Sequence, residues 1–230
     1  MYNVKVTVLQ YLLSALVAVF SLSLREMSHG LAAHWLGDDT AKRSGRLSLN
    51  PVKHIDWVGF VFMVIFHFGW AKPVPINPRN FKNPKAGMAV SSIAGPVSNI
   101  LLAFVGLLIY NISFTVYPAM PALGGNAISI IYYALILLIQ MNLSLAVFNL
   151  IPIPPLDGSR VLLSFLPQDK YFYVMRYERN IMLGFMLFIL ADRYIILRVF
   201  DFSILSTIIG FCTSNLLMWM QNIIEFLPFL

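Results

Sequence analysis

The stretch VTVLQYLLSALVAVFSLSL at residues 6–24 carries no charged side chain and is long enough to cross a lipid bilayer as one helix. A hydrocarbon core about 30 Å thick requires roughly 20 apolar residues in helical conformation. Residues 86–117, 127–151 and 203–224 form further uncharged runs of this kind. The first run is too long for a cleaved signal peptide and lacks a suitably placed small-residue cleavage site, so we expect it to be retained. The sequence therefore predicts a polytopic membrane protein with at least four spans.

The composition favours the same class of protein. Of the 230 residues, 59% are hydrophobic and 11% are charged, whereas an ordinary soluble domain has roughly 45–50% and 25%. The formal charge of +6 comes from Lys and Arg in short loops beside apolar runs, as the positive-inside bias predicts, so we expect no nucleic-acid partner. The single cysteine, Cys212, excludes an internal disulfide and a multi-cysteine metal cluster. A metal site would therefore need nitrogen and oxygen ligands.

Loop charges indicate how the chain crosses the membrane. Residues 72–85 carry four basic residues and no acidic one, whereas residues 118–126 carry no charge. We therefore place the first loop on the cytoplasmic side, and the basic segment 157–179 agrees with this orientation. A further span at about residues 180–200, before the run already noted at 203–224, brings the expected total to about five transmembrane helices in an all-α membrane protein.

Residues 57–70 form a short apolar stretch between two segments that alternate in character. About 14 residues are few for a span and suit a re-entrant segment, which other parts of the protein must cover. The flanking segments, GRLSLN at residues 45–50 and AKPVPIN at residues 71–77, each end in an Asn followed by Pro. We expect both to be short β-strands.

Two motifs carry residues suited to metal chemistry. The first apolar run continues as REMSH at residues 25–29. This sequence differs from the motif His-Glu-x-x-His only at its first position. In that motif the two His share a helical face and bind zinc, and the Glu takes a proton from the metal-bound water. Farther along, NLIPIPPLDG at residues 149–158 places three prolines after a helix end, which prevents a regular helix. Asp157 would then be a carboxylate ligand presented on unwound backbone.

These motifs resemble the site-2 protease family of intramembrane zinc metalloproteases, in its compact bacterial branch. Residues 36–56, 69–84 and 94–99 (AGPVSN), with the segment 149–158, are all similar to that family. The resemblance covers roughly residues 21–161. It places a protease-like membrane core at residues 1–165, followed by a C-terminal extension at residues 166–230 with two transmembrane helices.

The resemblance also implies roles for individual residues. Glu26 would be the general base, and His29 and Asp157 would be ligands of one zinc ion. The remaining expected contacts to substrate, or supports of the site, are Asn99, Asn149 and His54.

Arg25 stands where the motif of that family has its first His. A guanidinium stays protonated and has no lone pair for a metal, whereas catalytic zinc normally keeps three protein ligands and a water. His54 or His67 would supply the missing ligand if their loops fold back. Alternatively, Arg25 and His29 share a helix face with Asp157 opposite, so an Arg25–Asp157 ion pair would take the place of the metal.

The motifs also test the topology. Glu26 and His29 end the first helix and Asp157 follows the third long run, so a shared site requires similar depth in the membrane. If residues 57–70 crossed the bilayer, those helix ends would lie at opposite faces. We therefore expect a re-entrant segment, an external N-terminus and a site towards the cytoplasmic side of a bacterial cell membrane.

Three functions remain open. The first is an intramembrane metalloprotease that hydrolyses peptide bonds in or near transmembrane segments of membrane protein substrates. The second is a catalytically inactive pseudo-protease that binds membrane helices. The third, a transporter or channel, predicts paired half-repeats and polar residues on facing spans, and the sequence has neither. The lipid bilayer and a membrane protein substrate are the partners that we expect.

Overall fold

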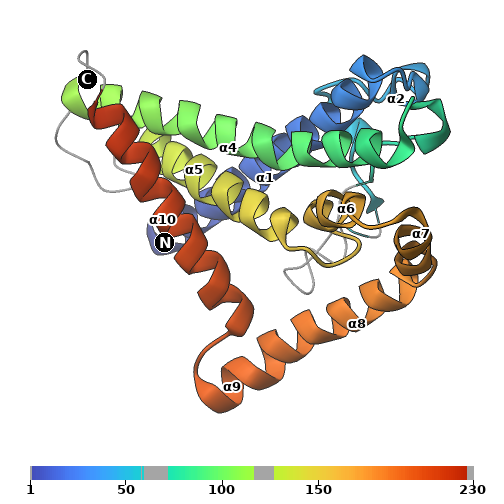
Figure 1. Ribbon diagram of the computed structural model, residues 1–230. Helices are drawn as coiled ribbons and strands as arrows, with labels where there is room; N and C mark the ends of the chain where they lie inside the picture. The colour runs from blue at the N-terminus through green and yellow to red at the C-terminus, as the bar shows by residue number, and fades with distance from the viewer. Residues whose placement is uncertain (1, 58, 60–71, 117–126, 227–230) are drawn as a thin grey trace.

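The computed structural model describes residues 2–57, 59, 72–116 and 127–226, which form a helical protein (Figure 1). The long helices are α1 (Tyr2–Trp35), α4 (Pro84–Val116), α5 (Ala127–Leu150), α8 (Glu178–Ala191) and α10 (Ile204–Glu225). The shorter ones are α2 (Thr40–Arg43), α6 (Asp157–Ser164), α7 (Gln168–Arg176) and α9 (Leu197–Phe200), with the 3₁₀ turns η1 (Pro51–Lys53) and η2 (Pro78–Asn80) and the π-helical turn η3 (Asp192–Ile196).

Five helical stretches of the described chain are long and apolar enough to cross a membrane. They are Thr7–Trp35, Pro84–Phe114, Ala127–Leu150, Glu178–Phe200 and Ile204–Glu225. Their number and positions agree with the spans predicted from the apolar runs. The prediction of an all-α polytopic membrane protein is confirmed.

The core of the bundle lies between α4, α5 and α10, and α1 packs against both α4 and α5 (Figure 1). Small residues allow the backbones to approach closely, as is common between helices in membranes. Ala103 on α4 is fully buried, and a Cβ added at Gly106 would lie 3.2 Å from a methyl group of Leu138 on α5. The buried cluster consists of Ala103, Leu107, Ile139, Leu143, Met220 and Ile224.

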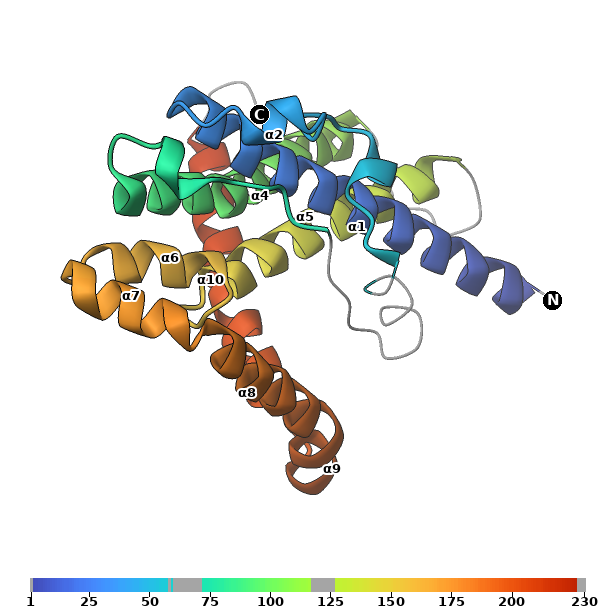
Figure 2. The same cartoon turned by 90° about the vertical axis from the view of Figure 1, so that its right-hand side faces the viewer.

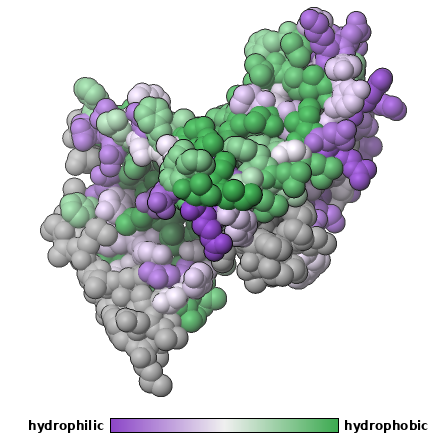
Figure 3. All heavy atoms as spheres, turned by 90° about the horizontal axis from the view of Figure 1, so that it is seen from below, coloured by the Kyte–Doolittle hydropathy of each residue, from purple (hydrophilic) through white to green (hydrophobic). Residues whose placement is uncertain are grey.

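The outer faces of the spans carry exposed apolar side chains. α8 projects away from the bundle (Figure 2), and its Leu187 is 67% exposed. Seen from below, apolar side chains cover a broad part of the described surface, and hydrophilic ones gather towards the right-hand end (Figure 3). Such apolar faces are the surface that a spanning helix presents to lipid.

A buried aspartate, Asp192, joins the end of the α8 span to the start of α10. Asp192 is 2% exposed and accepts hydrogen bonds from Ser203 Oγ (2.5 Å) and from the backbone N–H groups of Ile204 (2.8 Å) and Leu205 (3.3 Å). The first N–H groups of a helix lack partners within the helix and favour a negative charge. This contact explains how an acidic residue is accommodated in the span Glu178–Phe200.

The two short β-strands expected at residues 45–50 and 71–77 are not found among the described residues, and that detail of the prediction is wrong there. Residues 46–50 form bends and irregular backbone, and Asn50 begins η1 by accepting a hydrogen bond from Val52 N–H. Residues 72–77 have no regular secondary structure, and their backbone groups bind the side chains of Glu26, Asp38 and Arg46 and the carbonyl of His54. The predicted re-entrant segment 57–70 lies almost entirely outside the described residues.

Candidate active site

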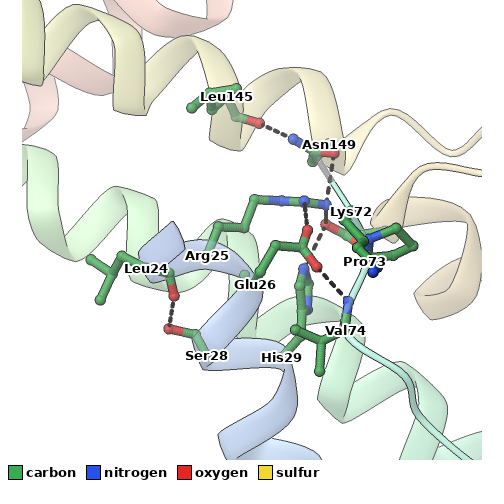
Figure 4. A network of polar contacts seen from close by, with 12 residues as sticks. Leu24, Arg25, Glu26, Ser28, His29, Lys72, Pro73, Val74, Leu145 and Asn149 are labelled. Atoms are coloured by element: carbon green, nitrogen blue, oxygen red, sulfur yellow. Dashed lines mark hydrogen bonds and ion pairs between the residues drawn. The ribbon is translucent and has the colours of Figure 1, made fainter. Parts of the chain in front are cut away.

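Arg25, Glu26 and His29 of the REMSH motif point from α1 into one network of contacts near the end of α5 (Figure 4). Arg25 and His29 are four residues apart, so their side chains leave the same face, and Glu26 lies beside them. Glu26 is 5% exposed and His29 is 6% exposed. The chain therefore buries Glu26 and His29, and leaves the Arg25 side chain only 13% exposed, within little more than one turn of a membrane helix.

The segment after α5 turns back and brings Asp157 to this face. Asp157 begins α6 after the irregular, proline-rich residues 151–156. Gly158 makes the turn possible, because a Cβ added there would lie 2.1 Å from the carbonyl oxygen of Leu150 at the end of α5. The Leu-Asp-Gly sequence thus supplies a carboxylate followed by the residue that lets the backbone return.

Arg25 is the centre of the resulting network. Its Nη1 donates to Glu26 Oε1 at 2.7 Å, and its Nη2 donates to Asn149 Oδ1 at 3.0 Å and to Asp157 Oδ2. Asn149 is oriented in turn by its own Nδ2, which donates to Leu145 O (2.8 Å) one helical turn earlier. The ion pair between Arg25 and Asp157 that the sequence suggested is therefore present.

His29 is held in a fixed orientation by α4. Its Nδ1 lies 2.7 Å from the carbonyl oxygen of Ser91, which only accepts hydrogen bonds, so Nδ1 carries the proton. Its Nε2 lies 3.4 Å from Asp157 Oδ2 and makes no hydrogen bond with any described residue. Gly95 gives the ring its space, because a Cβ there would lie 2.3 Å from His29 Nε2.

Glu26 is held by the extended chain before α4. Its Oε2 accepts from Val74 N–H at 2.9 Å, while Oε1 accepts from Arg25. Arg46 holds the same segment by donating from Nη2 to the carbonyl oxygens of Lys72 (2.6 Å) and Pro73 (3.2 Å). Both carboxylate oxygens of Glu26 are thus engaged within the protein (Figure 4).

A second buried carboxylate fixes the loops that carry this segment. Asp38 is fully buried and accepts from Asn77 N–H (2.7 Å), from Asn80 Nδ2 (2.6 Å) and from the N–H and hydroxyl of Thr40 (3.1 and 2.5 Å). Burial alone would raise the pKa of Asp38, but these hydrogen bonds stabilise the ionised form and hold its pKa below the ordinary value. Asp38 therefore joins the turn after α1 to the segment before α4.

The charge balance of the site also affects Asp157. Burial alone would raise the pKa of this carboxyl, but its interactions with His29 and Arg25 outweigh burial and hold the pKa below the ordinary value. Asp157 is therefore ionised, with His29 and Arg25 beside it. Arg25 compensates its charge through a direct ion pair.

Of the three expected supporting residues, the structure brings Asn149 into the network but leaves the other two outside its hydrogen bonds. Asn99 on α4 is fully buried, and neither atom of its amide makes a hydrogen bond with a described residue. His54 binds within its own loop, where Nε2 lies 2.7 Å from Ser48 O. His67, the other candidate for a replacement ligand, lies outside the described residues.

The arrangement does not fit a zinc site with three protein ligands. His29 is oriented as a ligand often is, with one ring nitrogen fixed by a carbonyl and the other directed into the site. However, Arg25 binds Asp157 Oδ2, the carboxylate oxygen that lies near His29 Nε2, and a guanidinium repels a divalent cation and cannot coordinate it. Among the described residues, no group of three or more His, Cys, Asp or Glu side chains is placed to hold a metal ion.

Four residues that shape this site were not predicted to do so. Ser91 and Gly95 orient His29 from α4, Val74 N–H binds Glu26, and the Arg46 side chain binds the carbonyls of the segment that carries Val74. Gly95, Val74 and Arg46 lie in segments that resemble the family, but the resemblance did not indicate their roles. Ser91 and Val74 act through main-chain atoms, which leave no pattern in the side chains.

Comparisons with known proteins identify the family. A model of peptidase family M50 matches residues 119–191. "Putative zinc metalloprotease YwhC" of Bacillus subtilis (strain 168) is 40% identical over 161 residues, which cover 70% of this chain and 71% of that protein. "Putative zinc metalloprotease MJ0611" of Methanocaldococcus jannaschii is 29% identical over 149 residues, or 64% of this chain and 71% of that protein. No solved structure matches the chain. The chain is an integral membrane protein that belongs to peptidase family M50, the site-2 protease family.

Proposed function

We propose that this chain is a pseudo-protease that binds transmembrane segments of other membrane proteins without hydrolysing them. The observation that carries the proposal is the position of Arg25, whose guanidinium binds Glu26, Asn149 and Asp157 together. These are the side chains that would otherwise serve as base, support and metal ligand. A buried cation that satisfies both carboxylates removes the need for a metal to neutralise them.

Asn99 supports the binding part of the proposal. A fully buried amide without a partner is costly, so such a group favours a ligand that supplies the missing hydrogen bonds. A substrate segment that unwinds within the membrane must place its own N–H and C=O groups on other polar groups. Asn99 offers one donor group and one acceptor for them.

Residues 72–77 offer less for edge pairing than their extended shape suggests. The N–H groups of Lys72, Val74 and Asn77 are already donated to His54 O, Glu26 and Asp38. Pro73 and Pro75 have no N–H, and the carbonyls of Lys72 and Pro73 accept from Arg46. We therefore do not assign the main substrate contact to this segment. Asn99 is fully buried, so its amide would meet a substrate backbone only after the side chains that cover it move aside.

The second candidate is an intramembrane zinc metalloprotease that hydrolyses peptide bonds in or near transmembrane segments. Glu26, His29 and Asp157 favour it, because the structure gathers all three and leaves His29 Nε2 directed towards Asp157. The names of the relatives in Bacillus subtilis and Methanocaldococcus jannaschii point the same way. In this candidate Arg25 would have to leave the site and another donor would have to replace it.

Zinc content separates the two candidates. We expect purified protein to contain far less than one zinc per chain, and Arg25→His to contain close to one, because the variant removes the competing cation and supplies an imidazole. Stoichiometric zinc in the unaltered protein would refute the pseudo-protease.

A matched assay tests turnover. Unaltered protein, Arg25→His and Arg25→His with Glu26→Gln are incubated with a membrane protein substrate that copurifies with the chain. We expect copurification with the unaltered protein, cleavage only by Arg25→His, and none when Glu26→Gln is added. Cleavage by the unaltered protein that Glu26→Gln abolishes would establish the second candidate instead.

We further propose that the chain resides in a bacterial cell membrane with the site towards the cytoplasmic side. The cations of residues 72–85 support this orientation. In a Cys212→Ser background, single cysteines at Asn3→Cys and Asp39→Cys should be labelled from opposite sides of the membrane. Labelling of both from one side would rule the topology out.

A further inference from the structure

A cleft of about 490 Å³ lies apart from the candidate active site, between the segment before α4 and the helices α6 to α8. Figure 2 shows this arrangement, with the beginning of α4 above α6 and α7. Its wall combines three cations, Arg79, Lys85 and Arg160, with the aromatic ring of Tyr171 and a single carboxylate, Glu178. The volume is typical of a pocket for a small ligand.

The charges of the cleft are only partly compensated from within. Glu178 Oε1 lies 2.5 Å from Arg160 Nη2, so these two side chains neutralise each other. Lys85 Nζ donates to the carbonyl oxygen of Leu166 and lies 5.9 Å from the centre of the Tyr171 ring. Neither partner carries a negative charge, and an ammonium has further donors to offer. Arg79 is exposed and makes no ion pair with any described residue, so an excess of positive charge faces the cleft.

The positions of the candidate spans indicate that the cleft lies near a membrane–water interface. The spans Pro84–Phe114 and Glu178–Phe200 begin with residues that line it. Beside it, α6 and α7 are short helices with basic residues and large exposed apolar side chains: Phe165, which follows α6, is 82% exposed, and Phe172 on α7 is 54% exposed. Helices of this character lie in the interfacial plane with their apolar side towards the acyl chains.

We propose that this cleft binds the phosphate group of an anionic phospholipid, with Arg79 and Lys85 as the principal contacts. A guanidinium fork and an ammonium are the groups that proteins use for phosphate. Basic pockets at the ends of membrane helices bind anionic headgroups, and the acyl chains can follow the exposed aromatic residues into the bilayer. A bound lipid would bridge the start of α4 to α7 and the start of α8, which the chain itself links here only through a few side chains.

Lipid binding to purified protein in an uncharged detergent tests the proposal. The protein is titrated with phosphatidylglycerol or with phosphatidylcholine, and bound lipid is counted by native mass spectrometry. We expect one tightly bound phosphatidylglycerol and much weaker phosphatidylcholine. Each contributing cation is worth about fivefold in affinity, so Arg79→Gln and Lys85→Gln should each weaken phosphatidylglycerol by about that factor.

Lys82→Gln is the matched control, because Lys82 is an exposed cation in the same loop that does not line the cleft. It should leave the affinity unchanged, and Arg79→Lys should retain most of it. Equal loss in Lys82→Gln and Arg79→Gln, or equal binding of the two lipids, would overturn the proposal. Displacement of phosphatidylglycerol by millimolar inorganic phosphate would show a site for a soluble phosphate compound and refute the lipid as its source.

Discussion

Replacement of Arg25 by Met tests whether the guanidinium stabilises the candidate site. The side chain is 13% exposed and contacts Glu26 at 2.7 Å, Asn149 at 3.0 Å and Asp157. Without it, two buried carboxylates would share the site with His29 alone. Removal of one partner from a buried ion pair costs about 3–5 kcal/mol, because the remaining charge is uncompensated. For a chain of this size, each kcal/mol lowers the melting temperature by about 2–4 °C, so we expect a decrease of roughly 6–20 °C.

Thermal unfolding in detergent at neutral pH measures this decrease. Arg43→Met is the control, because its guanidinium is 80% exposed and lies 3.8 Å from Asp39, an arrangement worth at most about 1 kcal/mol. The double variant Arg25→Met with Asp157→Leu removes both charges of the pair and should recover part of the loss. If Arg25→Met unfolds at the same temperature as Arg43→Met, the guanidinium does not stabilise the site and the reasoning fails.

Two further predictions concern the segments that position the site. Gly158→Ala would place a methyl group 2.1 Å from the carbonyl oxygen of Leu150. We therefore expect the free energy of unfolding to fall by at least about 3 kcal/mol, and size-exclusion chromatography to show little monodisperse protein. The control is Gly210→Ala, whose added methyl group meets nothing within 4 Å and which should behave as the unaltered protein. Asp38→Asn should lower the free energy of unfolding by about 1–3 kcal/mol at neutral pH. Because the pKa of Asp38 is depressed in the folded state, its contribution is complete above the unfolded pKa of about 3.9 and is lost as the pH falls through the lower folded pKa. The difference in denaturant midpoint between Asp38→Asn and the unaltered protein should therefore shrink below about pH 4, and a difference that persists there would contradict this account.

The spans could be predicted from the sequence, because they depend on the length of each apolar run and on the charges of the loops beside it. Both can be read from consecutive residues without knowledge of distant contacts. The pairing of Arg25 with Asp157, which lie far apart along the chain, was one of two alternatives that the sequence left open, and the structure contains it. Helical spacing placed Arg25 and His29 on one face. The expectation that Asp157 lies opposite them rested on the Leu-Asp-Gly motif and the family resemblance, because spacing along the chain cannot connect residues so far apart.

The strand prediction failed for residues 72–77 because alternation of residue type records backbone shape and not the bonding partner. The chain runs as an extended segment there (Figure 2), but it forms no regular secondary structure. Pro73 and Pro75 nevertheless remove two donors from any ladder. Of the groups that remain, the N–H groups of Val74 and Asn77 donate to Glu26 and Asp38, the carbonyls of Lys72 and Pro73 accept from Arg46, and the N–H of Lys72 donates to the carbonyl of His54. A pattern confined to a few residues carries no information about such distant partners.

Protein contacts hold each ionisable side chain of the site in position. Ser91 holds His29, Val74 holds Glu26, and Arg25 holds Asp157. Zinc binding would therefore gain no stabilisation from ordering these side chains. The ion would also have to displace the guanidinium that already neutralises Asp157. Once displaced, Arg25 would remain a cation at membrane depth without its buried carboxylate partner, which is itself costly. The same contacts imply that Arg25→His needs no rearrangement of Ser91, Val74 or the backbone at Asp157, so zinc uptake by that variant reports on Arg25 specifically.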